Sequence, residues 1–391
     1  MNPVTSPEKQ THSSTGVQNP LLELQKFGQS VWLDYIRRNL ITSGELKRLI
    51  DQDGLRGITS NPSIFEKAIA GSTDYADFLN QLRAQGLSSG DIYERIAIRD
   101  IQDSADMLLP VYKSTNKRDG YVSLEVSPTL ARDTQGSIAE ARRLWKAVAR
   151  PNIMIKVPGS PEGAPAVRQL ISEGININIT LLFAQEAYVK VAEAHIEGLE
   201  AAQKAGKDIS GIASVASFFV SRIDTLVDSI IDERLKTATP PSQDQELLRS
   251  LHGKVAIANA KQAYRRYQQM IAGQRWKSLA AHGAQMQRLL WASTSTKNPK
   301  YRDVLYIEEL IGPDTVNTIP PATMDAFRDH GIVRRTLDAD VAAADKTMAD
   351  LERAGISMQK VTDQLLEDAI KLFADAFQKL LSVVEQKKRN Q

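Results

Sequence analysis

The sequence predicts one α/β fold, a (β/α)8 TIM barrel with additional helices and a C-terminal amphipathic helix. Two observations lead to this prediction. Several short segments alternate apolar and polar residues, as strands with one apolar face do, and stretches with helical spacing lie between them. Because strands that alternate with helices pair in parallel through right-handed crossovers, eight of them are expected to close into a barrel.

The strands are expected in eight places along the chain. In order, these are residues 30–36, 55–60, 121–126, 152–158, 175–181, 211–217, 288–293 and 315–319. Helical spacing is clear in residues 137–149 and 184–205. Each strand alone could belong to an antiparallel sheet with one solvent-exposed face. Together the strands indicate that their polar faces enclose one polar interior.

The remaining segments complete the expected domain organisation. Residues 1–20, rich in Ser, Thr, Pro, Asn and Gln, should form a disordered tail. Residues 21–350 should form the catalytic barrel, with helical insertions near 62–113 and 228–286. Residues 351–391 should form a helical segment that packs on the outside or the mouth of the barrel, with a dimer seam as the alternative. Its apolar stripe consists of Leu366, Ile370, Phe373, Phe377, Leu380 and Val384.

Composition excludes several classes of protein. Lys plus Arg is 49 and Asp plus Glu is 47, a net charge of +2 that argues against a nucleic-acid surface. The chain has no cysteine, and its histidines are scattered, so we expect no metal site. No apolar run approaches the roughly 20 residues of a membrane span. We therefore expect a soluble, cytoplasmic protein.

Lys156 is the most informative single residue. It interrupts an apolar run, with Ile153, Ile155 and Val157 on one face of the expected strand and Lys156 on the other. An edge strand with its amine in water is the simpler interpretation, because buried lysines are rare. However, polar residues recur at or near the ends of the other expected strands, where a barrel gathers its functional groups. They are Asp34, Asn61, Glu125, Thr180, Ser217 and Ser293.

Other residues have plain alternatives when taken singly. Arg222 could be an ordinary surface arginine, although it lies one turn beyond a strand end, where a guanidinium can bind phosphate. Asn61 with Pro62 could be a simple turn, and Phe219 could be core. Residues 158–163 contain a glycine pair but no Gly-Lys-Ser/Thr, so a strand-to-helix turn is favoured over a nucleotide-binding loop.

Two motifs resemble the signatures of the transaldolases. They are residues 57–65 (GITSNPSIF) and 153–160 (IMIKVPGS), at the expected second and fourth strands. Further similar segments follow in order: 122–126 (VSLEV), 178–183 (NITLLF) and 217–222 (SFFVSR). The chain most resembles the longer bacterial transaldolases, which share residues 291–294 (WAST), 297–299 (KNP) and 312–320 (GPDTVNTIP).

The resemblance implies a role for each candidate residue. Lys156 would form the Schiff base, Asp34 and Glu125 would transfer protons, and Thr180 would support a catalytic water. The implied substrate-binding residues are Asn61, Asn178, Ser217, Phe219, Arg222, Ser293, Ser295 and Lys297. One departure is Ser295, which stands where many transaldolases have an arginine; Lys297 is the expected substitute in phosphate binding.

The residue types suit this chemistry. Cleavage of a C–C bond beside a hydroxyl needs an electron sink, and an iminium between lysine and a ketose supplies one without a cofactor. Two carboxylates can divide the proton transfers between the hydroxyl and the amine. The expected enzyme, a monomer or homodimer, moves a dihydroxyacetone unit from sedoheptulose 7-phosphate to glyceraldehyde 3-phosphate, giving erythrose 4-phosphate and fructose 6-phosphate.

Two alternatives differ from this transferase. One is a fructose 6-phosphate aldolase that releases dihydroxyacetone, although such aldolases carry tyrosine and glutamine where this chain has Phe219 and Glu125. The other is an inactive barrel that acts as a binding protein. Against it, an inactive scaffold has no reason to keep charges such as Lys156, Asp34 and Glu125, whose burial costs stability.

Overall fold

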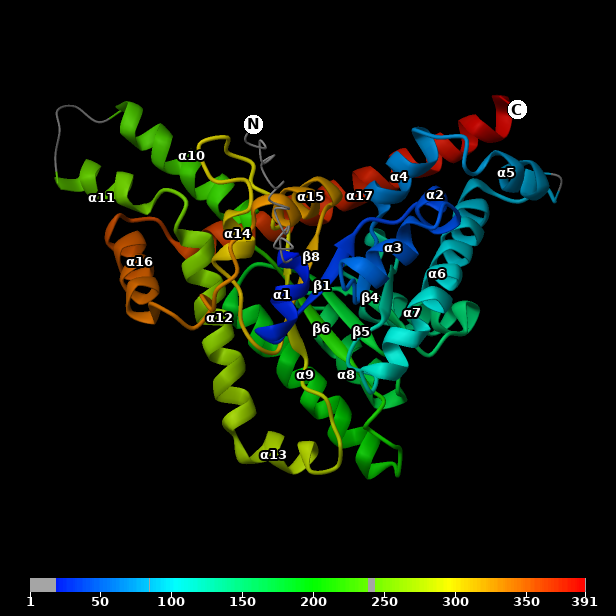
Figure 1. The fold of residues 1–391 in the computed structure, drawn as a ribbon, viewed down its shortest axis with the longest axis horizontal. Helices are drawn as coiled ribbons and strands as arrows, with labels where there is room; N and C mark the ends of the chain where they lie inside the picture. Colours follow the sequence, from blue (N-terminus) through cyan, green and yellow to red (C-terminus); the bar gives the residue numbers. More distant parts are fainter. Residues whose placement is uncertain (1–18, 84, 238–242, 391) are drawn as a thin grey trace, which may run out of the picture.

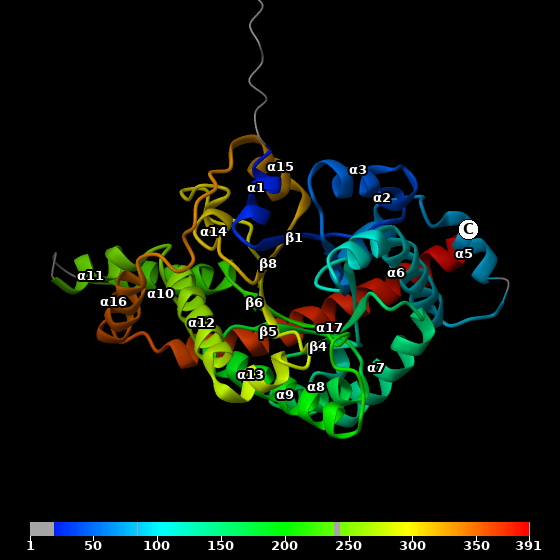
Figure 2. The same ribbon diagram turned by 60° about the horizontal axis from the view of Figure 1, so that its bottom comes forward.

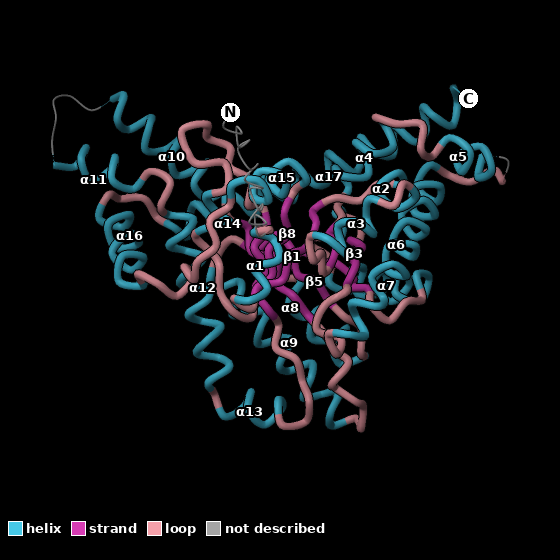
Figure 3. Tube along the Cα trace, in the orientation of Figure 1, coloured by secondary structure: helices cyan, strands magenta, loops and turns pink. Residues whose placement is uncertain are grey.

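The computed structural model describes residues 19–83, 85–237 and 243–390. Its strands pair in chain order, each parallel to its neighbours, and β8 pairs with β1 to close the barrel. The strands gather at the centre and the helices surround them (Figure 3). The predicted (β/α)8 barrel is therefore confirmed. Residues 1–18 of the expected N-terminal tail lie outside the described residues.

The bounds of all elements follow (Figure 1). The strands are β1 (Gln29–Asp34), β2 (Gly57–Thr59), β3 (Tyr121–Glu125), β4 (Ile153–Pro158), β5 (Ile177–Leu182), β6 (Ser214–Phe219), β7 (Arg288–Ala292) and β8 (Thr315–Ile319). The helices are α1 (Pro20–Lys26), α2 (Arg38–Thr42), α3 (Glu45–Gln52), α4 (Pro62–Ala70), α5 (Ala76–Arg83), α6 (Ser89–Ser114), the short 3-10 helix η1 (Pro128–Leu130), α7 (Thr134–Val148), α8 (Gly163–Glu173), α9 (Gln185–Lys204), α10 (Ser221–Thr237), α11 (Gln243–Leu251), α12 (Val255–Ala272), α13 (Gln274–Ala280), α14 (Leu305–Glu308), α15 (Pro321–His330), α16 (Val341–Arg353) and α17 (Met358–Asn390).

All eight predicted strands overlap an observed one, and the sixth differs most. It was expected at 211–217 but is β6, residues 214–219. Ile212 and Ala213 are buried like strand residues, yet the Ala213 N–H donates to the side chain of Asn176 and not to a neighbouring strand. The strand instead continues through Phe218 and Phe219, which are buried as well.

Register places the key side chains at one level of the barrel. Glu125 of β3 pairs with Lys156 of β4, and Lys156 pairs with Asn178 of β5. Residues that pair across parallel strands point to the same face, so the three side chains lie together inside the barrel. Gly159 allows β4 and β5 to stay close beyond this level, because a Cβ there would lie 2.9 Å from the Thr180 carbonyl oxygen.

A buried ionic cluster closes the opposite, N-terminal end of the barrel. Arg288 of β7 lies 2.9 Å from the Asp119 carboxylate and donates to the Ser30 hydroxyl. The Trp32 indole also donates to Asp119. These side chains are almost fully buried. The cluster lies at the N-terminal ends of the strands, and polar groups at this end of a barrel usually serve stability and not catalysis.

Additional helices enlarge the barrel, as expected from the sequence. Helices α4, α5 and α6 lie between β2 and β3, and α10 to α13 lie between β6 and β7. Helix α17 follows all the strands and crosses the molecule (Figure 2). It packs on α4, α6 and α10 and also contacts β5. The boundary expected at residue 350 falls inside α16. Within the described residues, no helix is both long and apolar enough to cross a membrane.

Candidate active site

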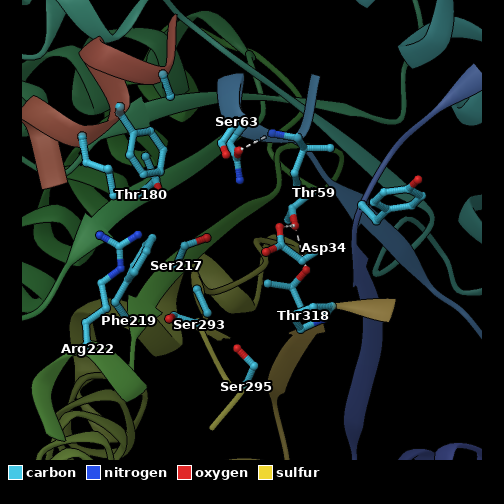
Figure 4. Close-up of a pocket in the computed structure, with 18 of the residues that line it drawn as sticks. Asp34, Thr59, Ser63, Thr180, Ser217, Phe219, Arg222, Ser293, Ser295 and Thr318 are labelled. Carbon is cyan, nitrogen blue, oxygen red and sulfur yellow. Dashed lines mark hydrogen bonds between the residues drawn. The ribbon is translucent and has the colours of Figure 1, made fainter. Parts of the chain in front are cut away.

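A cavity of about 410 Å³ opens at the C-terminal ends of the strands. Figure 4 shows side chains from several strands that converge on it. Every residue predicted for the site lines this cavity except Asn178 and Glu125, and Glu125 lines a separate, smaller cavity. The lining candidates are Asp34, Asn61, Lys156, Thr180, Ser217, Phe219, Arg222, Ser293, Ser295 and Lys297.

The amine of Lys156 lies at the bottom of the polar interior, beside one carboxylate. Its Nζ is 3.2 Å from Oε2 of Glu125 and donates to the Ser60 carbonyl at 3.2 Å. Both side chains are about 95% buried, with exposures of 5% and 4%. Burial raises the pKa of Glu125, although the neighbouring ammonium opposes the shift. The pair is thus an amine and a proton acceptor in direct contact.

Asp34 approaches the cavity from β1 and is half-buried. The Thr59 hydroxyl donates to its Oδ1 at 2.7 Å and lies 2.7 Å from the Thr318 hydroxyl (Figure 4). Desolvation raises the pKa of Asp34, while Lys156 and Lys297 oppose the shift. Asp34 faces the cavity, unlike Glu125, and so can meet a bound substrate directly.

Asn178 orients other groups. Its amide donates to the Ser123 hydroxyl at 3.0 Å, and its carbonyl accepts from Ser217 at 2.7 Å. Both ends of the side chain are therefore engaged, and the hydroxyl of Ser217 carries this chain of hydrogen bonds to the cavity wall.

The hydroxyl of Thr180 is buried and has no hydrogen-bond partner in the described protein. The backbone next to it is unusual, because Leu181 has φ 62° and the register between β5 and β6 shifts between Ile179 and Leu182. A left-handed leucine costs about 1–2 kcal/mol. Such strain is found at functional sites, and here it adjoins a polar atom that is free to bind.

Cations gather at one side of the cavity mouth. The Arg222 guanidinium stacks on Phe219, 5.5 Å from the ring centroid. It has no acidic partner among the described residues, and burial lowers its pKa. Lys297 donates to Ser295 at 2.6 Å, and partial desolvation, Arg222 and Lys67 lower the pKa of Lys297. Neighbouring cations without acidic partners favour an anion between them.

The Asn61 side chain caps a helix and also borders the cavity. Its oxygen accepts from the Ile64 N–H at 3.0 Å and begins α4. Asn61 is therefore a helix cap and not a simple turn, and it also lines the cavity, so its substrate-binding role stays a prediction. Ser293 has φ 56° at the end of β7 and lies 2.9 Å from the Ser221 hydroxyl, which fixes the loop that carries Ser295.

Sequence reasoning missed several residues of the cavity wall. Lys67 projects from α4 one turn after Ser63, and both line the cavity. The helical spacing of these two residues was the available signal. Leu372, Phe373 and Ala376 come from α17. Phe373 was recognised as part of an amphipathic stripe, but the stripe does not indicate which surface it contacts.

The fold and the site together are a closed barrel whose cavity holds a buried amine beside a carboxylate, with cations at its mouth. These are the groups that an imine-forming enzyme needs to act on an anionic carbonyl compound. A model of the family Transaldolase/Fructose-6-phosphate aldolase matches residues 31–384. A transaldolase of Trichodesmium erythraeum (strain IMS101) is 51% identical and covers 95% of this chain and 98% of its own length. Transaldolase 2 of Nostoc sp. (strain PCC 7120 / SAG 25.82 / UTEX 2576) is 50% identical over 94% and 97%, and the transaldolase of Frankia alni (strain DSM 45986 / CECT 9034 / ACN14a) is 43% identical over 95% and 98%. The chain belongs to the transaldolase/fructose-6-phosphate aldolase family.

Proposed function

We propose that the protein is a transaldolase, which moves a dihydroxyacetone unit from sedoheptulose 7-phosphate to glyceraldehyde 3-phosphate and forms erythrose 4-phosphate and fructose 6-phosphate. The carrying observation is the contact between Lys156 and Glu125 inside a closed barrel, with Asp34 facing the same cavity. The names of the relatives support the same reaction.

The first step is imine formation. The neutral amine of Lys156 adds to the ketose carbonyl, and the resulting carbinolamine loses water to leave an iminium. Glu125 is the proposed proton shuttle for this step, because it lies 3.2 Å from the nitrogen. The unpartnered hydroxyl of Thr180 is available to hold the water that leaves and returns.

The second step breaks the C–C bond. Asp34 takes the proton of the hydroxyl beside the bond, the aldose leaves, and the bond electrons pass into the iminium to give a neutral enamine on Lys156. Desolvation raises the pKa of Asp34, which makes the ionised carboxylate a better base. The enamine carbon then attacks an acceptor aldehyde, whose oxygen takes the proton back, and hydrolysis of the new iminium frees the product.

The cavity also has a place for the phosphate. Arg222, Lys297 and Lys67 adjoin one side of the mouth, and we propose that they bind the phosphates of donor and acceptor. Asn61 and Ser217 are the proposed contacts for sugar hydroxyls. We further propose a cytoplasmic enzyme, since anionic sugar phosphates do not cross membranes unaided. Whether it is a monomer or a homodimer can be measured by light scattering.

Borohydride trapping tests the proposed function. Addition of borohydride with fructose 6-phosphate should reduce the imine and fix one three-carbon adduct on Lys156, with loss of activity. Peptide mapping locates the adduct, and Lys156→Met should remain unlabelled and inactive. Lys297→Met is the matched control. It keeps the amine of Lys156, which should still be labelled. An adduct on another lysine, or full activity of Lys156→Met, would contradict the mechanism.

A further inference from the structure

Helix α17 supplies one wall of the active site. The ring of Phe373 lies with its centroid 6.0 Å from Nζ of Lys156, and its side chain is only 8% exposed. Leu372 and Ala376 line the cavity on either side of it, and Leu372 is half exposed at the outer edge. The amine is therefore covered by an aromatic ring from a segment more than 200 residues distant in the chain.

Contacts away from the cavity hold α17 in this position. Lys379 forms an ion pair of 2.8 Å with Glu66 of α4, and Lys387 donates to the Ser72 carbonyl at 2.7 Å. Phe377 packs edge-on against Tyr93 at 5.8 Å. Because these contacts hold the helix in place without Phe373, the ring over Lys156 is available for a role in the reaction.

Protonation of the enamine carbon is the step that competes with transfer, because transfer and release both end with hydrolysis of an iminium. After C–C cleavage the enamine on Lys156 has two outcomes. Its carbon can attack an aldehyde, which is transfer. Alternatively, the carbon takes a proton, the enamine becomes an iminium, and one water hydrolyses this to the free amine and dihydroxyacetone. The second outcome takes a proton at the carbon, consumes one water and returns the proton when the amine is freed, so its rate depends on whether a proton donor reaches the covered intermediate.

We propose that Phe373 is a specificity-determining residue that covers the three-carbon intermediate and makes the enzyme a transferase. The inference rests on the proposed function and adds a residue to it. Phe219 bounds the cavity from β6, where Arg222 stacks on it, and Phe373 bounds it from α17. Each ring lacks a hydroxyl and offers no proton to the enamine carbon.

Three variants test the inference. Phe373→Ala opens the cover, Phe373→Leu restores most of the apolar volume, and Leu380→Ala truncates a fully buried residue of the same helix that does not line the cavity. For each, the rate of dihydroxyacetone release from fructose 6-phosphate without acceptor is divided by the rate of transfer with erythrose 4-phosphate. This ratio reports how the intermediate is partitioned and does not change when only the fraction of folded enzyme changes.

Phe373→Ala should raise the ratio about tenfold, less than the roughly 100-fold or more that a positioned proton donor provides. Phe373→Leu should return the ratio toward the unmutated value, and Leu380→Ala should leave it unchanged even if the variant is less stable. An unchanged ratio in Phe373→Ala, or an equal rise in Leu380→Ala, overturns the inference while the proposed function stands. If the unmutated protein releases dihydroxyacetone as fast as it transfers it, both are overturned.

Discussion

Removal of the Arg222 guanidinium should weaken binding of phosphorylated substrates without unfolding the protein. In the described structure Arg222 has no acidic partner, and its ring contact is Phe219 at 5.5 Å. Arg222→Ala therefore breaks no ion pair. It also removes a charge whose burial is unfavourable, as the lowered pKa of the guanidinium indicates. The folded protein should lose at most the contact with Phe219, so a loss of activity can be assigned mainly to substrate binding.

The size of the loss follows from the kind of contact. A hydrogen bond to a charged group is worth about 1.5–3 kcal/mol, which corresponds to roughly a ten- to a hundredfold rise in KM for a sugar phosphate. The loss should be partial because Lys297 and Lys67 remain at the same side of the mouth. Arg222→Met keeps an unbranched stem over Phe219 and isolates the charge from the packing. Arg222→Lys keeps the charge but not the planar fork, so its KM should lie between the KM of the unmutated protein and that of Arg222→Met.

Initial-rate measurements give the comparison. KM is determined for fructose 6-phosphate and for unphosphorylated fructose as donor, in the unmutated protein and in each Arg222 variant, at two salt concentrations. The KM for the phosphorylated donor should rise and lose part of its salt dependence, while the KM for unphosphorylated fructose stays within about twofold. Equal losses for both donors would place the phosphate site elsewhere and refute the reasoning.

Three further outcomes are expected. Phe219→Tyr should increase dihydroxyacetone release relative to transfer, because the phenol brings a hydroxyl near the enamine carbon; an unchanged ratio in the acceptor-free assay would count against this. Since desolvation raises the pKa of Asp34 above its ordinary 3.8, this carboxylate takes up its proton at a higher pH, so kcat/KM should fall on acidification earlier than for an ordinary aspartate. Asp34→Asn should lower kcat by about 100- to 10,000-fold, and an unaltered acidic limb in its residual activity would refute the assignment. Arg288→Met leaves Asp119 buried and unpaired at the bottom of the barrel and should cost about 3–5 kcal/mol in urea unfolding, with KM unchanged; a stable variant would show that the pair contributes little.

Much of the site could be predicted because its residues lie on strands. Alternation along a strand determines which side chains face inward, and the eight strand ends meet at one rim, so Lys156 and Glu125 could be placed together although they lie on separate strands. In the structure the two residues pair across β3 and β4, and their side chains are in contact. Asn178 was harder, because the pattern shows that it faces inward but not that Ser123 and Ser217 occupy both ends of its amide.

The cavity wall contributed by helices could not be predicted in the same way. Helical periodicity indicates which face is buried but not which surface the face meets, so the stripe of α17 left its destination open. Lys67 is an exposed cation in a helix, and such residues are usually surface charges. It becomes a site residue only because Asn61 begins α4 at the mouth of the barrel.

Helix α17 is synthesised after every strand of the barrel. Because N-terminal parts of a chain fold first during synthesis, the ring of strands with its reactive amine can assemble before Phe373 leaves the ribosome. If Phe373 covers the three-carbon intermediate as proposed, a molecule whose α17 has not yet packed on the barrel lacks that cover. The order of the elements thus makes the selectivity of the enzyme the last property acquired by each new molecule.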